Sequence, residues 1–432
     1  MKILVIGSGA REHALAWRLA AEPGITEVLC APGNAGIARL ARTLPVDAGD
    51  VDGLLQAARH EGVTLTVVGP ELPLDRGIVD RFAAAGAPIF GPSRAAAQLE
   101  CSKVFAKAFM ARHGVPTARH HTCDTPDGAR ALARSGELGY PLVIKADGLA
   151  AGKGVVVAGD YPAAASAISA AMEGRVFGAA GERLVLEECL TGPEVSFFAL
   201  CDGHRAVPLA SAQDHKRIFD GDEGPNTGGM GALSPSPLMD RTLEERIMRR
   251  IVDPVLCGMR DEGHEYRGFL YVGLMLTADG PQVIEFNVRF GDPEAQVVIP
   301  LLEGELAPAL SAAAAGSLGS RSPAAGKSVA VGVVLASHGY PASVGTGLPI
   351  SGVDDAASRD GVLVFHAGTA LRGDTLVTAG GRVLTVVGRG DRYDQAIARA
   401  YDGVSQIRFD GMHYRRDIGQ KALEPGRMAR MR

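Results

Sequence analysis

The residues best suited to do chemistry are Glu285, Asn287 and Arg289, which alternate with apolar residues in the run from 283 to 294. Side chains of a β-strand alternate between its two faces, so a strand here carries all three on one face. A carboxylate and an amide oxygen two residues apart form a hard-oxygen chelate for Mg²⁺, and the arginine one step further can hold the phosphate oxygens of a Mg²⁺–nucleotide. The alternative is an edge strand with a solvated polar face. The opposite, apolar face carries Ile284, Phe286 and Val288.

The length and composition of the chain indicate a globular protein of several domains. Its 432 residues are too many for one core, and about two to four domains are expected. No apolar run is long enough to span a bilayer, and the opening residues 1–7 lead directly into a strand and a glycine turn without the pattern of a signal sequence. The net charge of -5 argues against a nucleic-acid surface. We therefore expect a cytoplasmic protein with neither a membrane nor a nucleic-acid partner.

The cysteines and histidines indicate no metal site of their own. The six cysteines include no C-x-x-C pair, and no histidine is clustered with them at zinc-ligand spacing. They are interpreted as small apolar residues in a reducing cytoplasm. His120 and His121 are adjacent, and neighbouring strand residues point to opposite faces, so a shared metal is not expected and a surface loop is the preferred interpretation.

Strand and helix patterns alternate through the first 90 residues, which predicts a doubly wound parallel sheet. Gly91 ends this part, and Ser93 is a suitable cap for one helix that runs to about His113. Residues 316–326 are rich in glycine, serine and proline and form the best linker, followed by the short strands and helix of a small α+β unit. The elements expected in the first 90 residues are strands at 2–7, 28–31, 65–68 and 88–90 and helices at 10–21, 51–60 and 76–85.

The first glycine-rich turn, residues 7–12, fits a phosphate better than a dinucleotide. Glu12 replaces the third glycine of a G-x-G-x-x-G fingerprint, and the second strand ends without the acid that holds a ribose. What survives is a strand, a glycine turn and a helix whose N-terminal amides can bind a single phosphate. The alternative is a turn that serves only tight packing of the helix on the strand.

Two further segments suit a nucleotide. The glycine run 145–155 is not a P-loop, because its spacing is one residue short and Gly154 stands where a serine or threonine binds Mg²⁺. It is a glycine-rich hairpin that can fold over phosphates, within reach of Lys145, although glycines alone also make a flexible turn. At residues 184–194 an apolar strand breaks into an acidic turn, which suits a nucleobase and ribose hydroxyls but also fits an ordinary surface turn.

These pieces in this order resemble the ATP-grasp fold. By that resemblance Lys103 and Lys145 hold the α- and β-phosphates of ATP, under a hairpin that closes as a mobile lid. The remaining implied contacts are Gly152, Lys153 and Gly154 in the hairpin, Glu187 and the Leu190 backbone at adenine, Glu194 at the ribose, and Glu285 and Asn287 on Mg²⁺ or Mn²⁺.

The resemblance implies an α/β and α+β multidomain protein. Residues 1–102 form an N-terminal doubly wound parallel-sheet domain, and 103–316 form a central ATP-grasp domain with a lid at about 118–190. Residues 327–420 form a small C-terminal α+β domain, followed by a basic tail at 421–432.

Several long motifs narrow the resemblance to the phosphoribosylamine–glycine ligase family, also called glycinamide ribonucleotide synthetase. The match runs from Met1 to about Gly419, nearly the whole chain. The motifs are Gly-Ser-Gly-Ala-Arg-Glu-His-Ala (7–14), Ala-Pro-Gly-Asn-Ala-Gly (31–36), Gly-Pro-Glu (69–71), Lys-Ala-Asp-Gly-Leu-Ala-Ala-Gly-Lys-Gly-Val (145–155), Gln-Asp-His-Lys-Arg (213–217), Gly-Pro-Asn-Thr-Gly-Gly-Met-Gly-Ala (224–232) and Arg-Phe-Gly-Asp-Pro-Glu (289–294).

The family implies that ATP, glycine and 5-phosphoribosylamine give glycinamide ribonucleotide, ADP and phosphate, through a glycyl phosphate, in purine biosynthesis. Lys145, Arg289 and Asp292 are the implied catalytic residues. Asp214, beside Lys216, and Asp292 are both candidates for the ammonium group of glycine, and the sequence does not decide between them. The other implied substrate contacts are Gly9, Arg11 and Glu12 in and after the first glycine turn, where the sugar phosphate is implied, together with Glu71 at the ribose, Lys216 and Gly291.

One position departs from ATP-grasp enzymes at large. Many carry an acidic metal ligand on the strand before the Glu-x-Asn strand, whereas the strand at 269–276 has Gly273 there and no acid. A second metal held only by protein is therefore in doubt. Another ATP-grasp carboxylate–amine ligase is the serious rival function, ahead of an oxidoreductase or a non-catalytic nucleotide-binding module. A monomer or weak dimer is expected.

Overall fold

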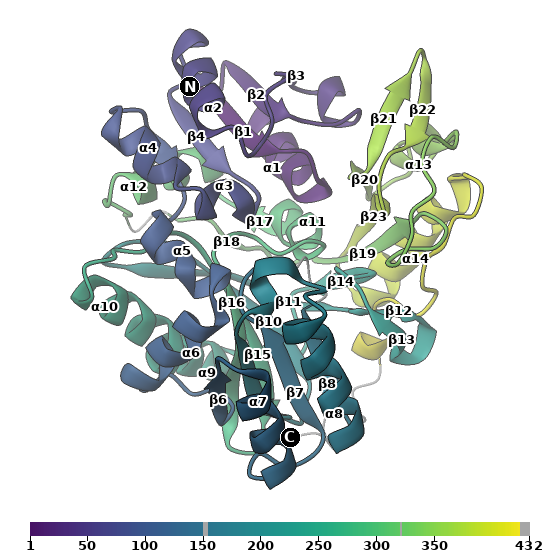
Figure 1. Ribbon diagram of the computed structural model, residues 1–432. Helices are drawn as coiled ribbons and strands as arrows, with labels where there is room; N and C mark the ends of the chain where they lie inside the picture. The colour runs from purple at the N-terminus through teal and green to yellow at the C-terminus, as the bar shows by residue number, and fades with distance from the viewer. Residues whose placement is uncertain (150–153, 320–321, 424–432) are drawn as a thin grey trace.

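The computed structural model describes residues 1–149, 154–319 and 322–423 (Figure 1). Within these ranges no helix is long and apolar enough to cross a membrane. The N-terminal sheet lies at the upper left of Figure 1, and the C-terminal strands with α14 lie at the right. The protein contains parallel and antiparallel sheets with covering helices, which confirms the expected α/β and α+β architecture.

The N-terminal region forms the predicted parallel sheet, with the strand order β3-β2-β1-β4-β5. The short strand β3 was not among the four strands expected from the sequence. Ile3 and Val5 of its central strand share one core with Val297 and Leu306, so this sheet is packed directly on the central region. The elements are β1 Lys2–Gly7, α1 Ala10–Ala20, β2 Glu27–Pro32, a 3₁₀ turn Ile37–Arg39, β3 Arg42–Thr43, α2 Val51–His60, β4 Leu65–Val68, α3 Glu71–Asp75, α4 Ile78–Ala84 and β5 Ile89–Phe90.

Two helix predictions in this part are wrong in their limits. The helix expected from Ser93 to His113 is two helices, α5 Arg94–Cys101 and α6 Lys103–Arg112. The break is at Ser102, whose backbone is extended and whose hydroxyl accepts a hydrogen bond from Phe105 N (3.0 Å), capping α6.

The helix expected from 76 to 85 begins only at Ile78, because Gly77 has a left-handed backbone with φ 78°.

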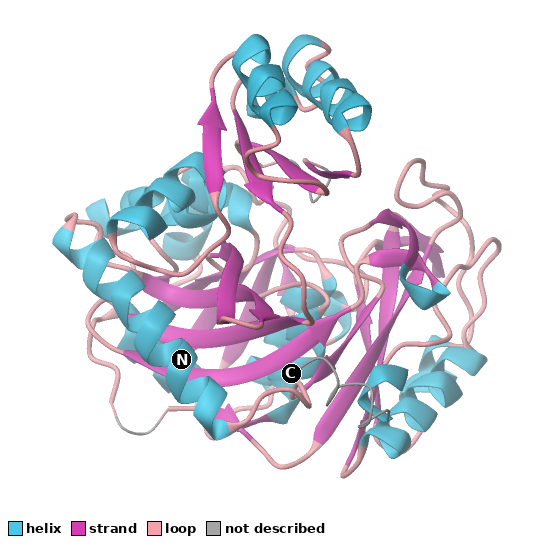
Figure 2. Ribbon diagram, turned by 90° about the horizontal axis from the view of Figure 1, so that it is seen from below, coloured by secondary structure: helices cyan, strands magenta, loops and turns pink. Residues whose placement is uncertain are grey.

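A four-stranded antiparallel sheet, in the order β6-β9-β7-β8, carries α7 and α8 and stands out from the rest of the molecule (Figure 2). His120 and His121 begin its edge strand β6, so their placement in a surface loop is wrong. They pair in register with Glu187 and Leu186 of β9. The elements are β6 His120–Cys123, α7 Pro126–Ser135, β7 Leu142–Ala146, β8 Val155–Ala158, α8 Tyr161–Ile168, a π-helical turn Ser169–Glu173, a 3₁₀ turn Gly178–Gly181 and β9 Leu184–Glu188.

An eight-stranded sheet, in the order β16-β15-β10-β11-β14-β19-β23-β20, joins the central and C-terminal regions. Strand β14 makes the connection, because it pairs with β11 on one side and with β19 on the other. The central elements are β10 Glu194–Asp202, β11 Ala206–Asp214, β12 Arg217–Phe219, a 3₁₀ turn Asp220–Asp222, β13 Glu223–Asn226, β14 Gly231–Ser234, α9 Arg241–Ile247, a π-helical turn Met248–Val252, α10 Asp253–Asp261, β15 Arg267–Thr277, β16 Gly280–Asn287, α11 Glu294–Val298, a 3₁₀ turn Ile299–Leu301, β17 Leu302–Glu303, α12 Leu306–Ala314 and β18 Ala324–Ala325.

The C-terminal strands pack their own apolar core against α14. Val331 and Val386 of the sheet meet Ile397 and Val404 of the helix in this core. The elements are β19 Val329–Ala336, α13 Val353–Ala357, β20 Val362–His366, β21 Thr369–Arg372, β22 Thr375–Thr378, β23 Arg382–Gly390, α14 Tyr393–Gln406 and a 3₁₀ turn Gln420–Leu423.

Candidate active site

Strand β16 carries a β-bulge at the centre of the candidate site. Its pairing with β15 runs Gly273 to Glu285 and then Leu274 to Val283, so Ile284 is an extra residue. The simple alternation expected from the sequence therefore fails at Ile284, which is half-buried instead of lying on the core face. Alternation resumes after the bulge, with Glu285 half-buried and apolar residues buried on the other face.

The side chains of Glu285 and Asn287 suit a divalent cation. The hydrogen-bonding pattern assigns the Asn287 amide nitrogen to Glu100 Oε1 (3.2 Å) and to the carbonyl oxygen of Phe286 (3.1 Å), which turns its amide oxygen away from Glu100. A carboxylate and an amide oxygen are the ligand types that Mg²⁺ prefers. In the described ranges no three or more His, Cys, Asp or Glu side chains gather as a metal site.

The neighbouring strand approaches Glu285 closely at Gly273. A Cβ at Gly273 would lie 3.2 Å from Glu285 Cγ, so this position has little room for the acidic ligand that many ATP-grasp enzymes carry.

Arg289 lies just beyond β16 and is clamped by two carboxylates. It donates to Glu100 Oε1 (2.6 Å), to Glu71 Oε2 (3.0 Å) and to the carbonyl oxygen of Phe290 (3.0 Å). Burial opposes its charge, but Glu100 and Glu71 hold the pKa of Arg289 above its ordinary value. The guanidinium is thus fixed beside Asn287, with its donors directed at carboxylates.

The pKa values of Glu100 and Glu71, the two carboxylates that hold Arg289, are both shifted from their ordinary values. Burial raises the pKa of Glu100 to about 6, against the opposing effect of Arg289. Burial also works against the charge of Glu71, yet Arg289 and Arg11 lower its pKa to about 2. Glu100 also accepts a hydrogen bond from Val288 N (2.7 Å), so one buried carboxylate touches three consecutive residues from Asn287.

The predicted phosphate lysines come from both sides of the site. Lys103, at the start of α6, donates to the carbonyl oxygen of Gly148 (3.0 Å), and burial lowers its pKa. Lys145 pairs with Glu187 (3.0 Å) and donates to the carbonyl oxygen of Ile284 (3.0 Å), at the bulge. The lysine therefore ties β7 to β16.

The rest of the hairpin is described only in part. Gly154 is buried and accepts a hydrogen bond through its carbonyl oxygen from Ala146 N (2.8 Å). Gly152 and Lys153 lie outside the described residues, and so does the part of the hairpin that was expected to close as a mobile lid. Leu190 is half-buried just after β9.

Three of the predicted ribose and glycine contacts form one charged group. Lys216 pairs with Glu194 (2.5 Å) and lies 3.7 Å from Asp214. Burial raises the pKa of Asp214, whereas Lys216 lowers that of Glu194. For Lys216, burial is outweighed by the two carboxylates, which raise its pKa.

Residues of the first glycine turn form hydrogen bonds with one another. Glu12 accepts hydrogen bonds from Gly9 N (2.6 Å) and from Arg11 Nε (2.5 Å), and Arg11 donates to the carbonyl oxygen of Phe290 (3.1 Å). The amide of Gly9 is thus occupied by a carboxylate in this structure. Because a Cβ at Gly9 would lie 3.4 Å from Asp292 Oδ2, this turn and Asp292 are neighbours.

Asp292 and Gly291 lie in the turn after β16. Asp292 accepts from Gln296 Nε2 (2.6 Å), and Arg382 donates to its carbonyl oxygen (2.7 Å). Burial opposes the charge of Asp292, but Arg382 and Arg11 keep its pKa below the ordinary value. A Cβ at Gly291 would lie 2.4 Å from Glu294 Oε2, so a side chain there would have to displace the Glu294 carboxylate.

Three residues of this region were not found from the sequence. Lys107 lies four residues after Lys103 on α6, and this i, i+4 spacing was a usable signal because it puts both on one helix face. Glu100 on α5 and Arg382 at the start of β23 belong to no motif that indicates a ligand, and only the folded chain brings them to the site.

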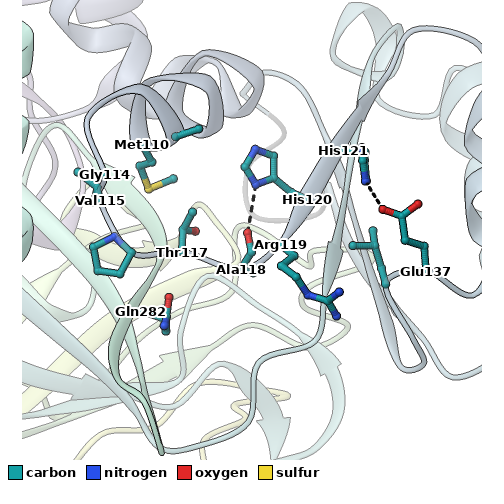
Figure 3. Close-up of a pocket in the computed structure, with 13 residues that line it drawn as sticks. Met110, Gly114, Val115, Thr117, Ala118, Arg119, His120, His121, Glu137 and Gln282 are labelled. Atoms are coloured by element: carbon teal, nitrogen blue, oxygen red, sulfur yellow. Dashed lines mark hydrogen bonds and ion pairs between the residues drawn. The ribbon is translucent and has the colours of Figure 1, made fainter.

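A cavity of about 680 Å³ lies beside the connection between α6 and β6 (Figure 3). Met110, Thr117 and Gln282 line it, and His121 at its rim pairs with Glu137 (2.7 Å). It contains none of the residues predicted for the nucleotide or the substrates, so we do not place the reaction there.

Comparison with known proteins identifies the family. Models of the phosphoribosylglycinamide synthetase N domain, ATP-grasp (A) domain and C domain match residues 1–100, 101–295 and 330–421. The chain is 50% identical to the phosphoribosylamine–glycine ligase of Xanthomonas axonopodis pv. citri over 99% of this chain and 100% of the relative. The chain belongs to the phosphoribosylamine–glycine ligase family. The resemblance inferred from the motifs is confirmed.

Other phosphoribosylamine–glycine ligases agree in sequence and in structure. That of Vibrio cholerae is 48% identical over 98% of this chain and 99% of the relative. The crystal structure of the Thermotoga maritima phosphoribosylamine–glycine ligase superposes with a TM-score of 0.83 and 35% identity, covering 96% of this chain and 100% of that one. A Campylobacter jejuni biotin carboxylase, with a TM-score of 0.75 and 17% identity over 99% of this chain and 96% of that one, shares the fold.

Proposed function

We propose that this chain joins glycine to 5-phosphoribosylamine with ATP, giving glycinamide ribonucleotide, ADP and phosphate, in purine biosynthesis. One observation carries the proposal: the segment 280–294 contacts both halves of the site. Lys145 of the nucleotide side bonds to the carbonyl oxygen of Ile284, and Arg11 of the first glycine turn bonds to that of Phe290. Such a segment suits a reaction that passes an activated group from a nucleotide to a second substrate.

The chemistry requires activation of the glycine carboxylate, which is a poor electrophile because of its negative charge. Transfer of the γ-phosphoryl group from ATP to a carboxylate oxygen gives glycyl phosphate and ADP. The amine of 5-phosphoribosylamine then attacks the carbonyl carbon, and phosphate leaves. Enzymes of phosphoryl transfer act chiefly by positioning and by electrostatic stabilisation.

The nucleotide residues are assigned as follows. Lys103 and Lys145 bind the α- and β-phosphates, and Arg289 acts on the transferred group from the position fixed by its two carboxylates. Mg²⁺ or Mn²⁺ bound there supplies positive charge that favours the transfer, and Glu285 and Asn287 would hold it. The further nucleotide contacts are Gly152, Lys153, Gly154, Glu187, Leu190 and Glu194.

The substrate residues are assigned to the other end of 280–294. Asp214 and Asp292 are the carboxylates available to the ammonium group of glycine. The sugar phosphate is placed at the first glycine turn, where Arg11 supplies positive charge. The further substrate contacts are Gly9, Glu12, Glu71, Lys216 and Gly291.

The setting of the enzyme follows from the same assignment. We place it in the cytoplasm as a monomer or weak dimer that binds its small-molecule substrates and neither nucleic acid nor a membrane. Its domains are assigned to residues 1–102, 103–316 with a lid at about 118–190, and 327–420, with a basic tail at 421–432.

The test is incubation with Mg²⁺, ATP and glycine, with and without 5-phosphoribosylamine, with ADP and AMP measured separately. Steady ADP release that requires both glycine and 5-phosphoribosylamine is expected. AMP and pyrophosphate as products would contradict the acyl phosphate. ADP release that requires a different amine would assign the chain to another ligation reaction.

A further inference from the structure

A closed chain of contacts runs through the buried ammonium of Lys107. Lys107 donates to Thr117 Oγ1 (2.7 Å), and Thr117 Oγ1 donates to the carbonyl oxygen of Val283 (2.6 Å). On its other side Lys107 pairs with Glu187 (3.0 Å).

Lys145 closes the chain of contacts. Its ammonium pairs with the other oxygen of Glu187 (3.0 Å) and returns to β16 through the carbonyl oxygen of Ile284 (3.0 Å). The contacts therefore link α6, the entry to the lid, the lid strands β7 and β9, and the bulge of β16. Both carbonyl oxygens used on β16, those of Val283 and Ile284, lie at that bulge.

The charges in this group do not balance. The side chains of Lys107, Lys145 and Glu187 are 3%, 7% and 4% exposed, so two ammonium groups face one carboxylate away from water. Burial costs a charged group several kcal/mol unless a partner compensates it. A buried excess of positive charge therefore suits a site that awaits an anion, and nucleotide phosphates are the anions assigned to it.

The two lysines are not equivalent. Lys145 ends a lid strand that leads into the glycine-rich hairpin, whereas Lys107 sits in the middle of α6 and is held by Thr117. If the ammonium of Lys145 turns toward a phosphate, its contact with Glu187 weakens. Without Lys107, Glu187 would then be a buried carboxylate with no cation.

We propose that Lys107 is a positioning residue of the nucleotide site, which keeps Glu187 neutralised so that the ammonium of Lys145 is available to nucleotide phosphates. The inference rests on the proposed function only in that this site binds ATP. Without Lys107, Glu187 retains Lys145, and the phosphates lose their cation.

The experiment compares wild type with Lys107→Met, Glu187→Gln and the double variant, and measures the dissociation constants of ATP and adenosine by calorimetry. Lys107→Met should raise the dissociation constant of ATP by about tenfold or more and that of adenosine by less than about threefold, because the effect acts through the phosphates. The double variant should bind ATP about as tightly as Glu187→Gln alone, because that single variant already carries any loss of the adenine contact assigned to Glu187. Arg112→Met is the matched control, because it removes a more exposed cation from the same helix.

Three outcomes would overturn the inference: unchanged ATP affinity in folded Lys107→Met, equal weakening of ATP and adenosine binding, or a loss of ATP affinity from Glu187→Gln to the double variant as large as that from wild type to Lys107→Met. Lys107→Gln, which keeps a hydrogen-bond donor for Thr117, replaces Lys107→Met if thermal unfolding shows the latter to be unfolded. Neither glycine nor 5-phosphoribosylamine enters the binding assay. Failure of the ligation assay with these ATP effects intact would therefore contradict the proposed function and leave this inference standing.

Discussion

At the scale of single residues, Glu100 organises the end of β16. Its carboxylate holds the amide of Asn287, the backbone nitrogen of Val288 and the guanidinium of Arg289. The polar groups that surround a metal ligand commonly matter to activity almost as much as the ligand, because they fix its orientation. Glu100 is therefore expected to act through Asn287 and Arg289 and not by touching a substrate.

Glu100→Gln should lower kcat/KM by about 10- to 100-fold and raise the Mg²⁺ concentration needed for half-maximal activity. The glutamine has about the same size but carries no charge, and with only one acceptor atom it cannot accept hydrogen bonds from Arg289 and Val288 N on separate oxygens as Glu100 does. A Mg²⁺ titration of ADP formation and of ADP affinity is the measurement. Glu137→Gln, on the lid surface, is the control, and an unaltered Mg²⁺ requirement in Glu100→Gln would refute the positioning role.

Glu285→Ala should reduce turnover at least about a hundredfold while changing thermal stability little. The side chain is half-buried on the polar face of β16, so its removal opens no apolar cavity. Asn287→Ala should act in the same direction. Initial rates at limiting Mg²⁺, together with thermal unfolding, provide the check. Near wild-type rates in either variant would show that this pair does not bind the metal.

Arg11→Met should damage both binding and stability. Glu12 would lose its ion-pair partner in a buried place, which commonly costs about 3–5 kcal/mol in the free energy of unfolding. The Michaelis constant for 5-phosphoribosylamine should rise, with the affinity for ATP nearly unchanged. Urea unfolding and ATP calorimetry separate the two effects. A large loss of ATP affinity would instead place the nucleotide at this turn.

At the scale of elements, helix α1 is joined to β20 by two buried histidines. His13 Nδ1 accepts a hydrogen bond from His366 N (2.8 Å), which requires an unprotonated nitrogen. Burial lowers the pKa of His13 to about 3 and that of His366 to about 4. Both values lie below the ordinary histidine pKa, so the unfolded chain binds protons that the folded chain does not.

Stability should therefore fall as the pH drops from about 6.5 toward 4, by about 2 kcal/mol for each histidine at pH 5. Thermal unfolding of wild type between pH 7.5 and 5 is the measurement. His13→Asn keeps an acceptor near the Nδ1 position and cannot be protonated. Its stability should therefore fall less steeply with decreasing pH than that of wild type. His121→Asn, on the exposed lid edge, should follow wild type. Identical slopes for all three proteins would contradict the assignment to His13.

The sequence was informative where one local pattern decided the structure. The strands at 2–7 and 65–68 have the bounds predicted for them, because short apolar runs between turn residues leave few alternatives. The break at Ser102 was not found, because Ser102 is held from outside by Asp147. The bulge at Ile284 was not found either, because its carbonyl oxygen is used by Lys145, which is remote in the sequence.

In the candidate site, too, the sequence indicated the residues that belong to local motifs and missed those that act through contacts made only in the folded chain. The residues named from motifs include Glu285, Asn287 and Lys145, whose types alone indicate a ligand. Glu100 and Lys107 act on those residues through contacts that no spacing in the sequence specifies, apart from the helical interval between Lys103 and Lys107. The roles of all these residues remain predictions until the variants are measured.

At the scale of the whole molecule, the strands of the eight-stranded sheet from β16 to β20 cannot all pair in the order in which they are synthesised. Strand β14 is synthesised well before β19, its neighbour in the sheet. Domains generally fold during synthesis from the N-terminal side, so one edge of β14 has no partner until residues 329–336 are made. Unpaired strand edges recruit strands of other chains. A chain cut before residue 329 should therefore aggregate and not behave as an independent ATP-binding fragment.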